Sequence, residues 1–372
     1  MKSADKPRVL VVYNRDFESA EDDPENCARA DIRGTSEDVV RALGGGGYRV
    51  SALGVTDDLL GAVAKIVAEA PDVVFNLCES IDGVSSLEPL LPLLLERAGL
   101  AYTGSSPLTL GLCLHKHKAK AVLRGAGVPT PEAAVLTKPD LSQVTLPFPL
   151  IVKPAREDAS VGISSDSVVH DRAALERQVT FVLARYRQPA LVERYIEGRE
   201  IYVSMLDRPD GEIEIFPLHE IDFSEMPAGR PRIVSFEGKW VESSPEFSGT
   251  KPVPCAGLDA ATLARIAEVA RTAFAAMELR DYARLDLRLS ADGTPYVIDV
   301  NPNCDLSARA GFARAAQAAG LDYAEVVRRI VALAWPRRPH ADTIPLAVRA
   351  RVAHRNPLAL GDRPARRRAR SG

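Results

Sequence analysis

The chain has 372 residues and a formal net charge of −3, and 46% of its residues are hydrophobic. This length and apolar content predict two or three packed globular subdomains rather than a disordered chain. Because the net charge is small, no global basic field indicates binding to nucleic acid or to an anionic membrane, so we expect small molecules as partners.

The cysteines are scattered and form no CxxC pair; they stand at positions 27, 78, 113, 255 and 304. An odd, scattered set is typical of reduced thiols rather than of a disulfide framework. No apolar segment follows the charged N-terminus, and no run of 18 apolar residues occurs. We therefore expect a cytoplasmic protein that does not associate with membranes.

Residues 1–112 alternate short β-branched runs with helical runs, which predicts an α/β subdomain resembling half of a doubly wound sheet. The expected strands are residues 8–14, 48–53, 72–77 and 100–104, and the expected helices are residues 35–43, 57–70 and 87–99. We interpret the acidic segment 15–34 as a mobile loop between the first strand and the first helix.

A basic helix that ends at Gly125 and Gly127 marks the next boundary, at residue 113. In residues 113–197 we expect strands at 148–155 and 189–196 and a helix at 171–186; in residues 198–336 we expect strands at 199–206 and 212–223, an irregular segment at 224–256, a helix at 259–277 and a hairpin. The Pro/Arg-rich residues 337–372 are expected to be disordered.

The hairpin carries Asp292 and Gly293, a strong two-residue turn signal. A turn centred on this pair places Asp286 opposite Asp299, and Asn301 on the same face. Facing carboxylates repel each other unless a cation neutralises them, and together with an amide oxygen they suit Mg²⁺. A solvated strand face is the alternative, and the residues of the hairpin alone leave that choice open.

Further features suit a magnesium nucleotide. Lys153 ends an apolar strand before the small-residue segment 155–164, whose backbone N–H groups could close over phosphates. Lys116 lies on the basic helix, and another apolar strand leads into Glu193 and Glu200. Each feature alone is more often an ordinary surface feature, so only their combination indicates a nucleotide site.

In order, the segments IVKPAREDASVGIS, VERYIEGRE, RLDLRL and YVIDVNPN resemble the ATP-grasp superfamily. The segment YTGSSPLTLGLCLHKHKAKAVLRGAGVPTP is similar to its D-alanine:D-alanine ligase branch, and the resemblance spans residues 72–335. It implies an α/β (α+β) ATP-grasp fold, in which an N-terminal Rossmann-like subdomain precedes two α+β subdomains that clasp ATP.

The resemblance also implies roles for individual residues in ATP binding. Lys116 and Lys153 match the lysines that contact the phosphates. Glu193 and Glu200 match acids that serve the adenine amino group and the ribose. The remaining positions expected to contact ATP are Arg194 and Ile196, through their backbone, and Ser160 in the 155–164 loop.

The metal and reaction residues follow in the same way. Asp286, Asp299 and Asn301 match the ligands of two Mg²⁺ or Mn²⁺ ions, although Asp at position 299 is one methylene shorter than the more usual Glu. Arg284 matches an arginine that steadies a tetrahedral oxyanion, and Lys239 matches a lysine on the reaction side.

The implied reaction is an ADP-forming ligation of amino acids or related small acids. A carboxylate attacks the γ-phosphate of ATP, and an amine then attacks the resulting acylphosphate. Closure of the 155–164 loop would exclude water. Two alternatives stay open: a D-alanine:D-alanine ligase of cell-wall synthesis and a non-catalytic ATP-binding regulatory module. A homodimer is possible, because dimers are common in this branch.

The chain departs from the branch where substrates bind. Residues that replace hydrogen-bonding or small residues of the family are Cys78, Ala159, Trp240, Asp305 and Ala310. We expect Glu88 to keep an acid near Cys78, and Arg309 or Arg314 to bind the carboxylate of the second substrate. These departures predict a substrate pair other than two D-alanines.

Overall fold

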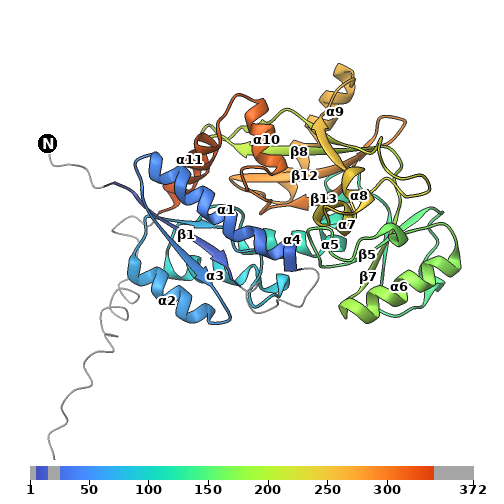
Figure 1. Ribbon diagram of the computed structural model, residues 1–372, viewed down its shortest axis with the longest axis horizontal. Helices are drawn as coiled ribbons and strands as arrows, with labels where there is room; N and C mark the ends of the chain where they lie inside the picture. Colours follow the sequence, from blue (N-terminus) through green and yellow to red (C-terminus); the bar gives the residue numbers. More distant parts are fainter. Residues whose placement is uncertain (1–5, 16–25, 339–372) are drawn as a thin grey trace, which may run out of the picture.

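The computed structural model describes residues 6–15 and 26–338, and it contains three sheets (Figure 1). The first is a three-stranded parallel sheet in the order β2-β1-β3. Its elements are β1 (Arg8–Asn14), α1 (Asn26–Gly45), β2 (Arg49–Val55), α2 (Leu59–Glu69), β3 (Val73–Asn76), the 3₁₀ helix η2 (Ser85–Leu87) and α3 (Leu90–Ala98). The predicted α/β character of this region is confirmed.

Strand β1 is apolar on both faces because helices cover both. Val9 and Val11 belong to the core that includes α1, whereas Leu10 and Val12 belong to the core that includes α2 and α3. Two predictions in this region were wrong. Helix α1 begins at Asn26, inside the segment interpreted as a loop, and residues 100–104 form only a single bridge, from Tyr102 to Val74.

The second sheet is four-stranded, in the order β4-β7-β5-β6, and every pairing in it is antiparallel. Its elements are β4 (Ala133–Leu136), η3 (Leu141–Gln143), β5 (Leu150–Pro154), η4 (Ser165–Ser167), β6 (Val168–Val169), α6 (Arg172–Tyr186) and β7 (Ala190–Arg194). Helices α4 (Pro107–Leu114) and α5 (Lys116–Gly125) precede it. Asp171 caps α6, accepting a hydrogen bond from the Ala174 backbone at 2.8 Å.

The third sheet is six-stranded, in the order β11-β10-β8-β12-β13, with β9 paired to β8. Its strands are β8 (Arg199–Asp207), β9 (Ile213–Ile215), β10 (His219–Asp222), β11 (Lys251–Pro254), β12 (Tyr282–Leu289) and β13 (Pro295–Asn301); its helices are α7 (Phe236–Trp240), α8 (Pro245–Ser248), α9 (Ala260–Ala276), α10 (Gly311–Ala318), α11 (Tyr323–Ala334) and η5 (Trp335–Arg337). The prediction that 224–256 is irregular was therefore wrong, because α7, α8 and β11 lie within it.

The hairpin of β12 and β13 has the predicted register at its acids but not at its turn. Asp286 lies opposite Asp299, as expected. The loop is longer than two residues: Leu289 pairs with Pro295, and the Ser290 N–H donates to the Thr294 carbonyl at 3.1 Å. A β-bulge next to Asp286 restores the register that the longer loop would otherwise shift. The acids therefore face each other because two irregularities compensate.

The first and third sheets share a core, which fixes the hairpin relative to the N-terminal region. Helix α11 packs against α1, and the core that contains Val9 also contains Tyr282 and Phe312 (Figure 1). Buried Asp281 reinforces this junction: it accepts a hydrogen bond from the Gly104 backbone at 2.7 Å and pairs with Arg337. The predicted disordered tail lies largely outside the described residues, and so do residues 16–25 of the acidic segment.

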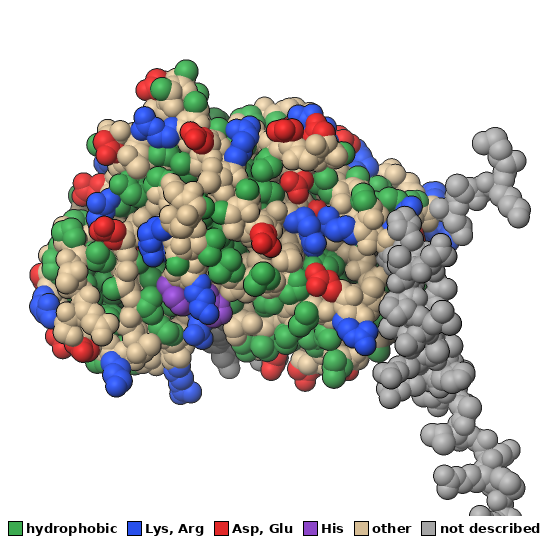
Figure 2. Space-filling model, turned by 180° about the vertical axis from the view of Figure 1, so that it is seen from behind, with side chains coloured by type: hydrophobic (Ala, Val, Ile, Leu, Met, Phe, Trp, Pro, Cys, Tyr) green, Lys and Arg blue, Asp and Glu red, His purple; other side chains and the backbone are tan. Residues whose placement is uncertain are grey.

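The surface carries both signs of charge. On the face shown in Figure 2, Lys and Arg side chains are interspersed with Asp and Glu rather than gathered into a patch of one sign. None of the helices within residues 6–15 and 26–338 has the length and apolar content needed to cross a membrane.

Candidate active site

A cavity of about 1230 Å³ lies between the second and third sheets, and every predicted site residue lines it. These residues are Lys116, Lys153, Ser160, Glu193, Arg194, Ile196, Glu200, Lys239, Arg284, Asp286, Asp299 and Asn301. The volume exceeds the roughly 300–1,000 Å³ of a usual small-molecule pocket, so the cavity has room for a large polar ligand and a second molecule.

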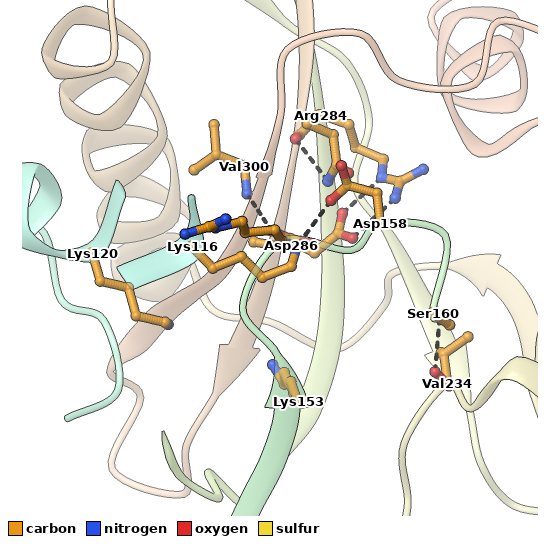
Figure 3. A network of polar contacts seen from close by, with 12 residues as sticks. Lys116, Lys120, Lys153, Asp158, Ser160, Val234, Arg284, Asp286 and Val300 are labelled. Carbon is orange, nitrogen blue, oxygen red and sulfur yellow. Dashed lines mark hydrogen bonds and ion pairs between the residues drawn. The ribbon is translucent and has the colours of Figure 1, made fainter. Parts of the chain in front are cut away.

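Lys116 joins the 155–164 loop to the hairpin (Figure 3). Its Nζ lies 2.9 Å from Asp158 Oδ1 and 2.8 Å from both carboxylate oxygens of Asp299. Burial acts to lower the pKa of Lys116, but the two carboxylates outweigh it and hold that pKa above its usual range. Lys116 therefore stays protonated, as a cation that binds phosphate must.

A second cluster of charges lies deeper, around Glu193 on β7. Its Oε1 is 3.0 Å from Lys120 Nζ and its Oε2 is 3.1 Å from Lys153 Nζ, and the Glu193 side chain is only 1% exposed. No role was predicted for Lys120, although it stands one helical turn after Lys116 on α5 and thus on the same helix face. That spacing was the signal that could have identified it.

Glu200 on β8 is also paired within the cavity. Its Oε2 lies 2.9 Å from Arg288 Nη2, and its Oε1 accepts a hydrogen bond from the Tyr202 hydroxyl at 3.3 Å. Alternation along β12 places Arg288 on the same face as Asp286, but no role was predicted for it. The backbone N–H of Arg194 donates to the Glu132 carbonyl at 3.0 Å. A backbone contact from Arg194 to a ligand would therefore use the Arg194 carbonyl.

The hairpin supplies oxygen ligands of the kind that divalent cations prefer. Within the described part of the chain, no group of three His, Cys, Asp or Glu side chains is arranged to hold a metal ion. The candidate set is instead the carboxylates of Asp286 and Asp299 with the amide of Asn301. Arg284 pairs with both oxygens of Asp286, at 2.7 and 2.9 Å, so an ion would share these carboxylates with basic side chains.

The 155–164 loop is held against helix α7 and the residues just before it. The Trp240 indole N–H donates to the Ala159 carbonyl at 2.9 Å, and the Ser160 hydroxyl donates to the Val234 carbonyl at 3.0 Å, as Figure 3 shows for Ser160. Ala159 and Ser160 have φ values of 53° and 62°, which are left-handed and unfavourable by roughly 1 kcal/mol each. These contacts hold the loop in a conformation that its own residues disfavour.

Lys239 and Arg314 line the cavity and form no ion pair with an acid among the described residues. Burial and nearby Arg284 lower the pKa of Lys239, whose Nζ lies 4.9 Å from the centre of the Trp240 ring. Burial also lowers the pKa of Arg314, and the buried Nε of Arg314 has no hydrogen-bond partner among the described residues. An anionic ligand would favour the charged forms of both side chains.

A smaller cavity of about 140 Å³ adjoins the first. Lys239, Arg284 and Asn301 line both cavities and thus mark the end at which they meet. Glu88 and Asn303 line only the smaller one. Cys78, which stands where the family has a histidine, is buried.

Comparison with known proteins supports a single family. The family model described as "D-ala D-ala ligase C-terminus" matches residues 122–332. D-alanine–D-alanine ligase A of Mesorhizobium japonicum is 32% identical over 304 residues, which cover 79% of this chain and 82% of that ligase. The uncharacterized protein y4sG of Sinorhizobium fredii is 35% identical over 271 residues, which cover 73% of this chain and 77% of that protein.

Solved structures share the fold. The D-alanine–D-alanine ligase from Bacillus anthracis complexed with ATP has a TM-score of 0.70 and 22% identity, covering 90% of this chain and 99% of that one. The VanG D-Ala:D-Ser ligase from Enterococcus faecalis has a TM-score of 0.65 and 16% identity, covering 88% of this chain and 99% of that one. The fold predicted from the sequence is confirmed.

Proposed function

The chain belongs to the D-alanine–D-alanine ligase-like family of ATP-grasp enzymes. We propose that it joins a small carboxylic acid to an amine in this cavity, and that these two substrates are not two molecules of D-alanine. The chain is an ATP-dependent, ADP-forming carbon–nitrogen ligase that uses a divalent metal. The observation that supports the ATP chemistry is the meeting of Lys116, Lys153 and the hairpin carboxylates in one cavity, whereas the unusual pair is supported by the side-chain groups that Ala159 and Ala310 lack in the same cavity.

The charges in this cavity suit phosphoryl transfer to a carboxylate. Lys116 and Lys153 would bind the phosphates, and their present partners Asp299 and Glu193 keep them in place before ATP arrives. Arg284 would stabilise the oxyanion that forms when the amine attacks the acylphosphate. Ile196, which is buried and lines the cavity, would contact the adenine together with the backbone of Arg194.

We propose that Asp286, Asp299 and Asn301 hold two Mg²⁺ or Mn²⁺ ions. When bound, such ions would neutralise charge on the triphosphate. Their number can be counted by titrating Mn²⁺ into the protein with ADP and following free Mn²⁺ by electron paramagnetic resonance. Asp299→Ala should lower the number of bound ions, and an unchanged number would remove Asp299 from the ligand set.

The substrate side supports an unusual pair. Ala159 and Ala310 have no side-chain hydrogen-bonding group where the family places one. Of the two arginines considered from the sequence, Arg314 is the stronger candidate for the carboxylate of the amine substrate, because it is half-buried and its Nε lacks a partner among the described residues, whereas Arg309 is exposed.

The decisive experiment is a screen for ADP release with ATP and Mg²⁺ across pairs of amino acids, dipeptides and hydroxy acids. We expect at least one pair to drive ADP release, and Lys153→Met to reduce it by at least about 100-fold, the loss expected when a major transition-state contact is removed. Lys138→Met is the matched control, because Lys138 is exposed and lies outside the cavity. Efficient turnover with D-alanine alone would overturn the proposed pair, and no turnover with any pair would contradict the catalytic proposal.

The alternatives from the sequence are less well supported. A non-catalytic module would have no need of the carboxylates that face each other in the cavity, and a D-alanine:D-alanine ligase would need another way to position its first substrate. The homodimer, the cytoplasmic location, the individual site roles and the subdomain limits stay predictions.

A further inference from the structure

One end of the large cavity combines apolar walls with an acid. Ile151 and Ile233 belong to a small apolar core against which Tyr195 packs, and all three line the cavity. Glu200 on β8 and its partner across the sheet, Ile221 on β10, also line it. Apolar side chains suit a planar base, and a carboxylate accepts hydrogen bonds from the hydroxyls of a sugar. These walls therefore suit the nucleoside part of ATP.

Arg288 is a buried arginine that binds Glu200 and two backbone carbonyls at this end of the cavity. It stands opposite Glu200 in the pairing of β12 with β8, and its Nη2 lies 2.9 Å from Glu200 Oε2. Its Nη1 donates to the Gly198 carbonyl at 3.1 Å, and its Nη2 also donates to the Arg232 carbonyl. The Arg288 side chain is only 4% exposed. It therefore joins two segments that are distant in sequence from β12 to one carboxylate.

The segment before β8 reaches Arg288 because it passes directly against the end of β12. Gly198 has a φ of 141°, and a Cβ at this position would lie 2.0 Å from the Leu289 carbonyl oxygen, so only glycine permits the approach. The centre of the Arg288 guanidinium lies 5.5 Å from the centre of the Tyr195 ring and 5.6 Å from that of Phe223. Such contacts between a cation and aromatic rings are attractive, so they hold the guanidinium in place.

The charge of Arg288 also affects how well Glu200 accepts hydrogen bonds. Burial raises the pKa of Glu200, and Arg288 opposes that rise. A carboxylate has about four acceptor positions, which is more than its contacts with Arg288 and the Tyr202 hydroxyl require. An ionised carboxylate makes stronger hydrogen bonds than a protonated one. Removing Arg288 would therefore weaken Glu200 as an acceptor as well as free its side chain.

We propose that Arg288 is a positioning residue that fixes Glu200 as the acceptor for a ribose hydroxyl, so that the site selects a ribonucleotide over a deoxyribonucleotide. Arg288 acts through Glu200 and does not itself touch the nucleotide. The inference rests on the proposed function, in which Glu200 serves the ribose of ATP, and it adds the residue on which that contact depends.

The test is isothermal titration calorimetry of ADP, 2′-deoxy-ADP and 3′-deoxy-ADP in the presence of Mg²⁺. We expect wild-type protein to bind ADP about 10- to 100-fold more tightly than at least one of the deoxy compounds, the range for one hydrogen bond to a charged group. Arg288→Met should reduce that ratio to about threefold or less, and Glu200→Gln should reduce it about as much. A merely structural role would weaken the binding of all three nucleotides equally and leave the ratio unchanged.

Further variants test whether Arg288 acts through Glu200. In the Glu200→Gln background, Arg288→Met should not reduce the ratio further, and a further fall would overturn the positioning role. Arg288→Lys keeps the charge with fewer donors, so its ratio should lie between those of wild type and Arg288→Met. Arg271→Met, at an exposed position on α9, should leave the ratio unchanged. Where Arg288→Met does not fold, as judged by circular dichroism, Arg288→Lys decides, and a full wild-type ratio in that variant would contradict the inference.

The outcomes distinguish this inference from the proposed function. If wild-type protein binds ADP no more tightly than either deoxy compound, or if Arg288→Met keeps the full ratio, the inference is wrong even where ADP release continues. Absence of ADP release with every substrate pair would instead count against the ligase proposal, and that screen uses wild-type protein with ATP, so its result does not depend on how Arg288 acts.

Discussion

Removing Lys120 should destabilise the protein through Glu193. The two groups are 3% and 1% exposed and lie 3.0 Å apart, with Lys153 on the other carboxylate oxygen at 3.1 Å. Breaking a buried ion pair costs about 3–5 kcal/mol. We expect Lys120→Met to cost about 3 kcal/mol, because Lys153 still pairs with Glu193, and Glu193→Gln to cost about 5 kcal/mol, because both lysines then lose their anion.

A double-mutant cycle tests this reasoning. The double variant should cost no more than Glu193→Gln alone, which gives a coupling energy of about 3 kcal/mol. Urea-induced unfolding of the ligand-free protein, followed by circular dichroism, measures each change in the free energy of unfolding. Lys118→Met, at an exposed position on the same helix, should change it by less than about 0.5 kcal/mol. Additive effects of the two single variants would refute the buried triad.

The same lysine gives the stability a pH dependence of known sign. Burial lowers the pKa of Lys120 in the folded protein from its usual value of 10.5, and Glu193 opposes this. Between the folded pKa and 10.5 the unfolded chain binds the proton more readily, so this group makes stability rise with pH in that window. Lys120→Met should remove that contribution.

Further variants test the substrate side. Trp240→Phe removes the donor to the Ala159 carbonyl, a bond worth about 1 kcal/mol, and should raise phosphate release without ligation about fivefold, measured as the ratio of phosphate to amide product. Lys239→Met removes a half-buried cation and should raise the melting temperature by about 2 °C while reducing ADP release at least about tenfold; a lower melting temperature would contradict its unfavourable burial. Arg314→Leu should raise the KM of the amine substrate about 10- to 100-fold without changing that of ATP, and an equal effect of Arg309→Leu would remove the distinction between them.

Much of the fold was predictable because it rests on local patterns. The strands of the first sheet follow from apolar runs, and Asp171 and Asp259 cap their helices as such residues do. The predicted start of helix α1, at residue 35, was too late, because the acidic segment before it resembles a loop in composition. Helix α7 and strand β11 were missed because each is short and draws its support from distant residues.

Which residues line the cavity was predictable where a motif contains them and not where contacts cross between subdomains. The lysines and hairpin acids stand in recognisable segments. By contrast, Glu88 and Asn303 are 215 positions apart. The sequence around Lys120 likewise contains no pattern that identifies Glu193 as its partner. Such pairings depend on how sheets pack, and a single sequence contains no direct signal for them.

The bulge in β13 lies between the loop of the hairpin and the facing acids Asp286 and Asp299. Because side chains alternate between faces, a one-residue change in hairpin length would ordinarily turn Asp299 from the cavity into the core. Here the irregularity lies between the loop and the acids and absorbs that change. Loop length and the bulge are therefore coupled in this hairpin: a longer or exchanged loop keeps Asp286 opposite Asp299 only if the bulge changes with it, in evolution or by design.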